Sequence, residues 1–434
     1  MITRMRGSFH LPRVTRRASF VLLANAMLRA SGTLVFIVVG RNKGPDDAGV
    51  LALALGYLAI LTTLFMGLDD LLIREVTAKP ERVVKDVLAY AVLRIPLTVL
   101  ACFVVFALSQ TASHVTPSQS IAMRLIVVSA IFDGFAGLGQ AVLYSFGGFQ
   151  QLLYAAGVIL LLRAGVGSLL LVTTGFVAAA AMWPVSAFVG AVAVLFFAAQ
   201  LIRRSGIALT PLVVEWPLVR HQAVFMPSFG AVSLLSALEY QLDVILLSAM
   251  RSPREVGIYA AASTVMNVVA LIPQAYRAVL YPDLIRLRSE PPAKLYALIS
   301  RAARNMAVLG ILIATAITLT APWLIAHVFG PRFYGSQQVV QILIWNVVFM
   351  FVNVPLVRYL VASGQQNRVS GVLLISISVN LGVNLLLIPN LGAMGSAWAR
   401  LASSAVFVAV VGVYVMQQLQ GAQREEANRN EVVK

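Results

Sequence analysis

The residues best placed to do chemistry in this sequence are charged side chains inside otherwise apolar stretches. Seven of the 33 Lys and Arg residues fall within or at the edges of such stretches, and all seven are arginine. They are Arg29, Arg94, Arg124, Arg163, Arg277, Arg358 and Arg400. Arginine keeps its charge when buried, and its planar guanidinium group matches phosphate oxygens. Because charge inside a bilayer is energetically unfavourable, such residues usually face a protein-lined cavity and mark a substrate path.

Position along the apolar stretches separates these arginines. Arg29 and Arg163 lie in the middle of theirs, where a role in a cavity or an ion pair is favoured. The other five lie near the ends, where extension of the long side chain to the membrane surface explains them equally well.

Three acidic residues share the same apolar environment, namely Asp133, Glu239 and Asp243. Glu239 and Asp243 are four residues apart, so both project from one face of a helix. Two carboxylates held together in a membrane can carry a proton or bind a sodium ion. The competing interpretation is that each of the three acids neutralises a nearby arginine. Asp69 and Asp70, by contrast, are expected on a solvated loop face.

Asparagine supplies most of the remaining polar surface within these stretches. Asn25, Asn267, Asn346, Asn353, Asn380 and Asn384 are the members of this set. Their expected role is hydrogen bonding between helices.

The elements that must position these side chains are membrane-spanning helices. Hydrophobic residues make up 59% of the chain and charged residues 12%, against about 25% charged in soluble domains, and the mean hydropathy is +0.86. Apolar runs of about twenty residues, the length that crosses a bilayer, occur twelve times. Their approximate bounds are 18–39, 49–68, 88–109, 121–144, 152–174, 176–201, 222–249, 257–280, 306–328, 338–362, 369–388 and 395–417. The sequence therefore predicts an all-α polytopic membrane protein, and the join near Thr173 and Gly175 is its least distinct boundary.

The distribution of basic residues predicts the orientation of these spans. Segments assigned to the cytoplasm carry 21 Lys and Arg residues and those assigned outside carry five, in alternation along the chain. Because positive residues stay on the cytoplasmic side, both termini are expected there. The same rule explains the net charge of +16 without nucleic acid as a partner. The basic N-terminus precedes a long stretch that contains Arg29, which favours an uncleaved first span over a signal peptide.

An internal repeat divides the twelve spans into halves. Residues 44–52 (GPDDAGVLA) reappear 208 positions later as residues 252–260 (SPREVGIYA), with the Pro, the Gly and the aliphatic helix start in register. A weaker echo pairs Gly175 with Gly392. Because each half has an even number of spans, both halves begin and end on the same side of the membrane. They are therefore expected to be parallel repeats related by an axis along the membrane normal. We predict an N-terminal six-helix lobe (1–205), a cytoplasmic linker (206–221), a C-terminal six-helix lobe (222–420) and a cytoplasmic tail (421–434).

The sequence carries no enzyme signature. There is no Gly-x-x-x-x-Gly-Lys-Ser/Thr loop, the four histidines lack metal-ligand spacing, and Cys102 is the single cysteine. The longest connections between spans reach only about two dozen residues, which is short for a soluble catalytic domain. We therefore expect neither catalysis nor a metal or organic cofactor.

Loop and helix-end residues give the chain a family resemblance. They are Val39-Gly40-Arg41, the run Gly44 to Gly49, Gly67-Leu68, the run Val256 to Ala262, Ile272-Pro273, Asn380 to Asn384, Leu387-Ile388-Pro389 and the run Gly392 to Ala397. With them the chain resembles, over nearly its whole length, the polysaccharide flippases of the multidrug/oligosaccharidyl-lipid/polysaccharide exporter superfamily. The resembling motifs are mostly structural glycines and prolines, so they indicate the fold more strongly than the cargo.

The resemblance implies outward flipping of an undecaprenyl-pyrophosphate-linked oligosaccharide across the bacterial inner membrane, for polysaccharide or lipopolysaccharide biosynthesis. Two lobes would alternate access to a cationic cavity, as an antiporter driven by protons or sodium ions. The expected partners are the lipid-linked anionic oligosaccharide, membrane lipid, a polysaccharide polymerase and chain-length proteins.

Residue roles follow from this implied function. Arg29, Arg277, Arg358, Arg163 and Asn25 are the expected substrate-binding residues. Glu239, Asp243 and Asp133 are the expected ion-coupling residues.

Three other classes compete with a flippase. A multidrug exporter of the same superfamily carries cations, which an all-arginine set of basic residues would repel. A membrane glycosyltransferase or ligase predicts a large periplasmic loop, which the predicted connections lack. A major-facilitator transporter predicts a Gly-x-x-x-Asp-Arg loop after the second span, where this chain reads GLDDLLIR.

Overall fold

The protein is built from membrane-length helices. The computed structural model describes residues 11–64, 66–109, 115–208, 213–273, 276 and 292–432. All regular elements in these residues are helices, and twelve segments are long and apolar enough to span a membrane. Each corresponds to one predicted span, which confirms the all-α polytopic fold. Helices suit a bilayer because they satisfy their backbone hydrogen bonds internally.

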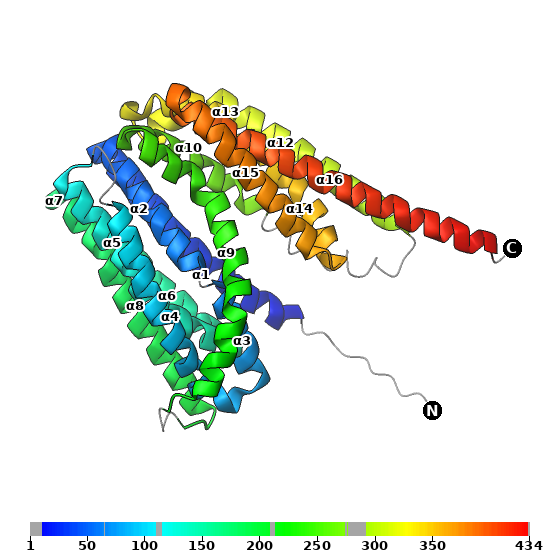
Figure 1. Cartoon of the computed structure of the whole chain (residues 1–434). Helices are drawn as coiled ribbons and strands as arrows, with labels where there is room; N and C mark the ends of the chain where they lie inside the picture. Colours follow the sequence, from blue (N-terminus) through cyan, green and yellow to red (C-terminus); the bar gives the residue numbers. More distant parts are fainter. Residues whose placement is uncertain are drawn as a thin grey trace. The chain divides into compact units, whose positions relative to one another are not determined.

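The chain forms two compact units, of which the first contains the described residues of 11–38, 57–109 and 116–233. It holds most of α1 (Leu11–Lys43), the end of α2 (Pro45–Leu64) and the start of α9 (Trp216–Met250). Its other elements are α3 (Met66–Ala78), η1 (Pro80–Arg82), α4 (Val83–Ser109), α5 (Pro117–Phe146), α6 (Phe149–Leu160), the π-helical η2 (Leu161–Val166), α7 (Gly167–Thr173) and α8 (Phe176–Arg204). Figure 1 shows α5 and α8 side by side in this unit.

Close packing of α5 against α8 depends on small residues. A methyl group on Gly139 of α5 would lie 2.8 Å from Cγ1 of Val194 on α8. Small residues of this kind allow helices to approach closely within a membrane. The start of α5 is fixed by a capping box, in which Thr116 and Gln119 exchange side-chain to backbone hydrogen bonds.

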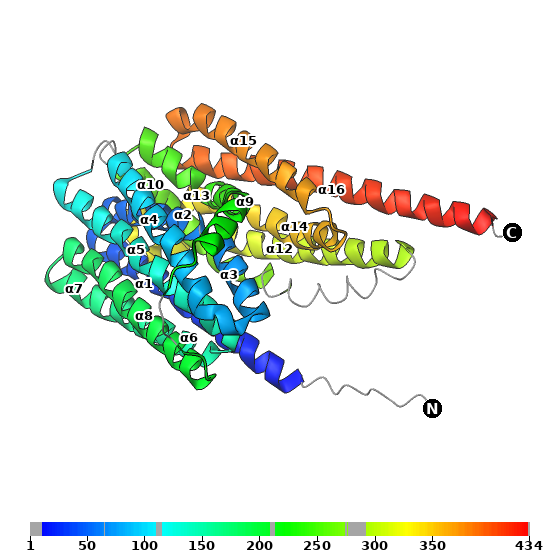
Figure 2. The ribbon, with the colours of Figure 1, turned by 60° about the horizontal axis from the view of Figure 1, so that its bottom comes forward.

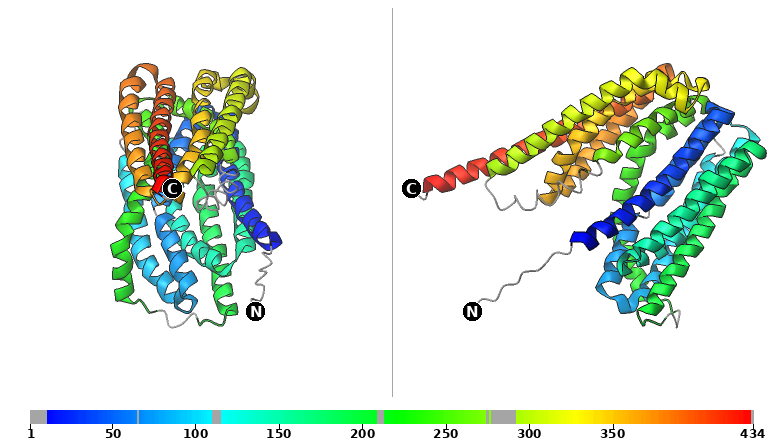
Figure 3. Two further views of the ribbon diagram at one scale, coloured as in Figure 1. Left: turned by 90° about the vertical axis from the view of Figure 1, so that its right-hand side faces the viewer. Right: turned by 180° about the vertical axis from the view of Figure 1, so that it is seen from behind.

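The second unit contains the described residues of 39–56, 115 and 234–432. It holds α10 (Pro253–Val269), α12 (Pro292–Val328), η4 (Pro331–Phe333), α13 (Ser336–Leu343), α14 (Asn346–Ala362), α15 (Gln366–Leu391) and α16 (Ala393–Val432). In this unit α12 lies against α14 (Figure 2), and the end of α16 extends past α15 (Figure 3). The boundary between the units falls within α9, at Ser233 and Leu234. The predicted lobe limits at 205 and 222 rest on the helix count and the repeat, and they stay a prediction.

The structure bears out the positions that define the repeat. Helices α2 and α10 begin at the equivalent residues Pro45 and Pro253. The following glycines pack together, so that a methyl group on Gly49 would collide with the carbonyl oxygen of Pro253, and one on Gly257 would collide with that of Pro45. These four residues are named the proline–glycine contact below, and each side of it uses equivalent residues of the two halves.

The second echo of the repeat also has a structural basis. Gly175 and Gly392 precede α8 and α16 with φ angles of +114° and +55°, which are strained for other residues. Helix α7 ends at Thr173, so the predicted join between the fifth and sixth spans lies where the sequence placed it.

Candidate functional site

A buried arginine in the second unit holds two carboxylates from another helix. The side chain of Arg400 on α16 is 6% exposed, and its Nε lies 3.6 Å from Oδ2 of Asp243. Its Nη1 lies 3.8 Å from Oε1 of Glu239 and donates a hydrogen bond to the main-chain oxygen of the same residue. Both acids come from one face of α9, as their spacing predicts. With both acids ionised, this triad of Arg400, Asp243 and Glu239 has one negative charge in excess.

Asp243 is fully enclosed by hydrogen-bond donors. Its Oδ2 accepts from the Tyr259 hydroxyl at 2.8 Å, and its Oδ1 accepts from Nδ2 of Asn380 and of Asn384, each at 2.9 Å. The two asparagines are four residues apart on α15, and they bond across helices as predicted. A buried carboxylate with this many donors has its hydrogen-bonding capacity satisfied and is held in one orientation.

Glu239 has a different environment from Asp243. Its side chain is 34% exposed, and it forms an ion pair with Arg400. It also lines a pocket beside the triad. Of the two acids, Glu239 is therefore the one that a solute in the pocket can reach.

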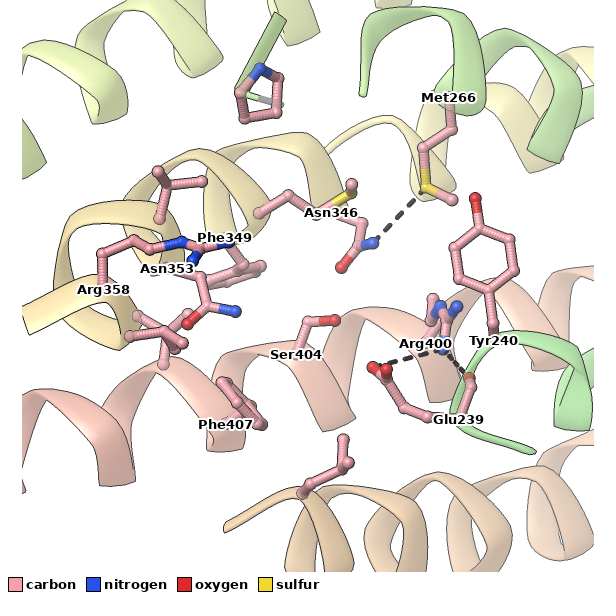
Figure 4. A pocket seen from close by; sticks show the side chains of 16 residues that line it. Glu239, Tyr240, Met266, Asn346, Phe349, Asn353, Arg358, Arg400, Ser404 and Phe407 are labelled. Atoms are coloured by element: carbon pink, nitrogen blue, oxygen red, sulfur yellow. Dashed lines mark hydrogen bonds and ion pairs between the residues drawn. The ribbon is translucent and has the colours of Figure 1, made fainter. Parts of the chain in front are cut away.

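The pocket has a volume of about 280 Å³ and lies within the second unit. It is lined by α9, α10, α14, α15 and α16, largely with apolar side chains. Its polar lining consists of Glu239, Tyr240, Asn346, Asn353, Arg358, Arg400 and Ser404. Figure 4 shows Arg358 and Asn353 toward one end and Arg400 with Glu239 toward the other. Each end of the pocket thus has an arginine beside a second polar side chain.

The spacing of residues on α14 explains how it lines the pocket. Asn346, Met350, Asn353 and Val357 recur at intervals of three or four, which places them on one helix face. On α16 the same interval aligns Arg400 with Ser404.

A second set of buried charges lies in the first unit. Arg94 on α4 forms an ion pair with Asp69 on α3, and it interacts electrostatically with Asp133 on α5. Asp133 also interacts with Arg163, whose Nε donates a 2.7 Å hydrogen bond to Ser186 on α8. Arg163 lies in the π-helical η2, a type of irregularity that is frequent at functional sites.

The predicted site residues are thus distributed over several places. Arg358 and Glu239 line the pocket, and Asp243 lies in the triad beside it. Arg163 and Asp133 come together in the first unit. Arg29 and Asn25 are exposed on α1, and Arg277 lies outside the described residues. The functional roles of all eight stay predictions.

The structure decides between two open interpretations for Arg94 and Arg400, and it shows that the expectation for Asp69 is wrong. Arg94 and Arg400 do not extend to a membrane surface, because they are only 4% and 5% exposed and bind acids from neighbouring helices. Asp69 does not lie on a solvated loop face, because α3 continues past it and Arg94 contacts it. The sequence did not indicate that Tyr259 donates a hydrogen bond to Asp243.

The fold is that of MOP-superfamily transporters. An inward-facing multidrug resistance MATE transporter of that superfamily superposes with a TM-score of 0.75 at 13% identity, over 93% of this chain and 99% of its own. The lipid II flippase MurJ in an inward closed conformation also has a TM-score of 0.75, at 10% identity over 94% and 90%. The eukaryotic MATE transporter AtDTX14 has a TM-score of 0.63, at 15% identity over 95% and 99%.

Sequence places the chain more narrowly than the fold does. It belongs to the polysaccharide biosynthesis protein family, whose model matches residues 14–288, more than half of the chain. No curated protein matches it significantly. The chain therefore combines membership of the polysaccharide biosynthesis protein family with the fold of MOP-superfamily transporters.

Proposed function

We propose that the protein flips an undecaprenyl-pyrophosphate-linked oligosaccharide from the cytoplasmic to the periplasmic leaflet of the bacterial inner membrane. Two six-helix lobes would alternate access, and a proton or sodium gradient would drive the cycle. The cargo would then reach a polysaccharide polymerase and its chain-length proteins.

One observation carries the proposal most strongly. The chain belongs to the polysaccharide biosynthesis protein family, and its pocket, which is lined by candidate membrane-spanning helices, has Arg358 at the end away from the Arg400 triad. Guanidinium groups in a water-poor environment bind phosphate oxygens strongly and in defined geometry. Exposed Arg29 on α1 is a further guanidinium that the pyrophosphate could meet.

The environments of the two acids in the triad support different roles for Asp243 and Glu239. Asp243 is occupied by Arg400, Tyr259 and two asparagines, so we assign it a structural role. Glu239 supplies the excess negative charge and borders the pocket. We therefore propose Glu239 as the exchangeable ion-coupling residue.

Export of organic cations is the second candidate function, and the Glu239 carboxylate in the pocket favours it. The two functions differ in the charge of the cargo. A binding measurement on the purified protein in lipid nanodiscs separates them, with undecaprenyl pyrophosphate and ethidium as the two probes.

The flippase proposal predicts that undecaprenyl pyrophosphate binds and ethidium does not. Replacement of Arg358 or Arg29 by Ala should weaken lipid binding about tenfold or more, because a charge-assisted hydrogen bond contributes about 1.5–3 kcal/mol. Arg124→Ala is the matched control, because Arg124 lies 4.6 Å from the Phe106 ring and does not line the pocket. Ethidium binding without lipid binding would refute the flippase proposal.

The same preparation tests coupling. In proteoliposomes, Glu239→Gln should abolish the dependence of lipid movement on an imposed ion gradient. If movement in that variant keeps its full dependence, Glu239 has no part in coupling.

A further inference from the structure

Two amide side chains in the pocket lack the hydrogen-bond partners that burial demands. Asn346 on α14 is 2% exposed, and its Nδ2 donates to Sδ of Met266 at 3.4 Å. Its Oδ1 is buried, accepts no hydrogen bond from any described residue, and lies on the side of Ser404 in Figure 4. Oδ1 of Asn353, seven residues further along α14, is likewise buried and unpartnered within the described chain. Buried acceptors in this state favour an occupant that donates hydrogen bonds.

The rest of the polar lining mixes donors with acceptors. Glu239 adds a carboxylate acceptor, whereas Arg358 and Arg400 add donors. A phosphate group only accepts hydrogen bonds, so it would be repelled by Glu239 and would leave Asn346 unsatisfied. An organic cation without acceptors would face both guanidinium groups. Neither occupant matches the whole lining.

A sugar ring matches both the polar and the apolar parts. Each sugar hydroxyl donates one hydrogen bond and accepts others, as the mixed lining requires. The C–H faces of a ring can pack against Phe349 and Phe407, which line the same pocket. The volume of about 280 Å³ is close to the lower end of small-molecule pockets, which span about 300–1,000 Å³. This space suits one ring rather than a whole oligosaccharide.

We propose that the pocket of the second unit binds one neutral sugar ring of the cargo, with Asn346 and Glu239 accepting hydrogen bonds from its hydroxyl groups. This inference rests on the proposed function, because it takes the cargo to be a lipid-linked oligosaccharide. Arg358 lies toward one end of the pocket, where it can bind the pyrophosphate that joins the ring to its lipid.

Binding of defined lipids to the full-length protein in nanodiscs tests the proposal. The probes are undecaprenyl pyrophosphate and the same lipid carrying one glucose, galactose, N-acetylglucosamine or N-acetylgalactosamine. At least one sugar-bearing lipid should bind about tenfold more tightly than the bare lipid, a difference of about 1.4 kcal/mol. Asn346→Leu removes the acceptor at similar volume, so it should abolish this gain and leave affinity for the bare lipid unchanged. Asn390→Leu, at an exposed position near the end of α15, is the matched control.

The outcomes separate this inference from the proposed function. If all five lipids bind equally well, the sugar site is refuted while the flippase proposal stands. If Asn346→Leu weakens the bare and sugar-bearing lipids by the same factor, Asn346 only shapes the pocket and the inference is wrong. If no lipid binds, the proposed function itself fails and the sugar site fails with it.

Discussion

Removal of the Asp243 carboxylate should destabilise the protein more than removal of any exposed acid. In Asp243→Leu, Arg400 loses the partner 3.6 Å from its Nε, and the Tyr259 hydroxyl loses its acceptor. Breaking a buried ion pair from one side destabilises by about 3–5 kcal/mol where it leaves a charge without a partner. Arg400 keeps Glu239 as a second partner, so we expect the lower end of this range, about 3 kcal/mol. A buried donor left without an acceptor adds about 1–3 kcal/mol. Asn384 keeps its bonds to the Oδ1 and main-chain oxygen of Asn380, so the expected total is about 4–6 kcal/mol.

A double-mutant cycle shows whether the charge pair causes this loss. Arg400→Met combined with Asp243→Leu removes both charges and fills the space with apolar atoms, which is often tolerated. The double variant should therefore lose at least about 2 kcal/mol less than the sum of the single variants. Asp70→Leu is the control for loss of an exposed carboxylate and should change stability by less than about 0.5 kcal/mol.

The assay is reversible unfolding in mixed detergent micelles, followed by tryptophan fluorescence. Each variant gives a free energy of unfolding, and the four values of the cycle give the coupling energy. Additive losses in the double variant would refute the reasoning, because they would show that Asp243 and Arg400 stabilise the second unit independently.

Two further predictions concern other parts of the chain. Gly49→Ala and Gly257→Ala should each lower the free energy of unfolding by about 1–3 kcal/mol, because the new methyl group meets backbone atoms of the opposite helix. Gly412→Ala, with nothing within 4 Å, should leave it unchanged or raise it, and equal effects at all three positions in the same micelle assay would contradict the packing argument. The Lys85 ammonium group lowers the pKa of Glu215 below its ordinary value of 4.5, so this pair stabilises the fold above that pH and ceases to do so as pH falls below it. Lys85→Met should therefore lower the melting temperature slightly at pH 7 and not at pH 3, and a difference that stays the same at both values would refute the pair's contribution.

The number and order of the spans could be predicted because each depends on local composition. An apolar run of sufficient length must form a helix in a bilayer, whatever surrounds it. The sequence also indicates where α2 and α10 begin, at Pro45 and Pro253, since proline favours the first turn of a helix.

The triad could be predicted only in part. The spacing of Glu239 and Asp243 placed both on one face of α9, and that of Asn380 and Asn384 could have done the same for α15. Which faces meet depends on how helices far apart in the sequence pack together. Arg400, more than 150 positions after both acids, therefore could not be matched with them from one sequence. Its place near the start of a span made a surface position equally reasonable.

The proline–glycine contact has a consequence for the ancestry of the chain. Pro45 meets Gly257 as Pro253 meets Gly49, so both sides present the same motif. This is the isologous arrangement by which two identical subunits associate about a two-fold axis. A six-span half of this chain carries both the proline and the glycine, so it is self-complementary at this point. Fusion of two such subunits after gene duplication would preserve the contact. Gly49 and Gly257 would then be constrained for the same reason, because a side chain at either position would disrupt the same contact.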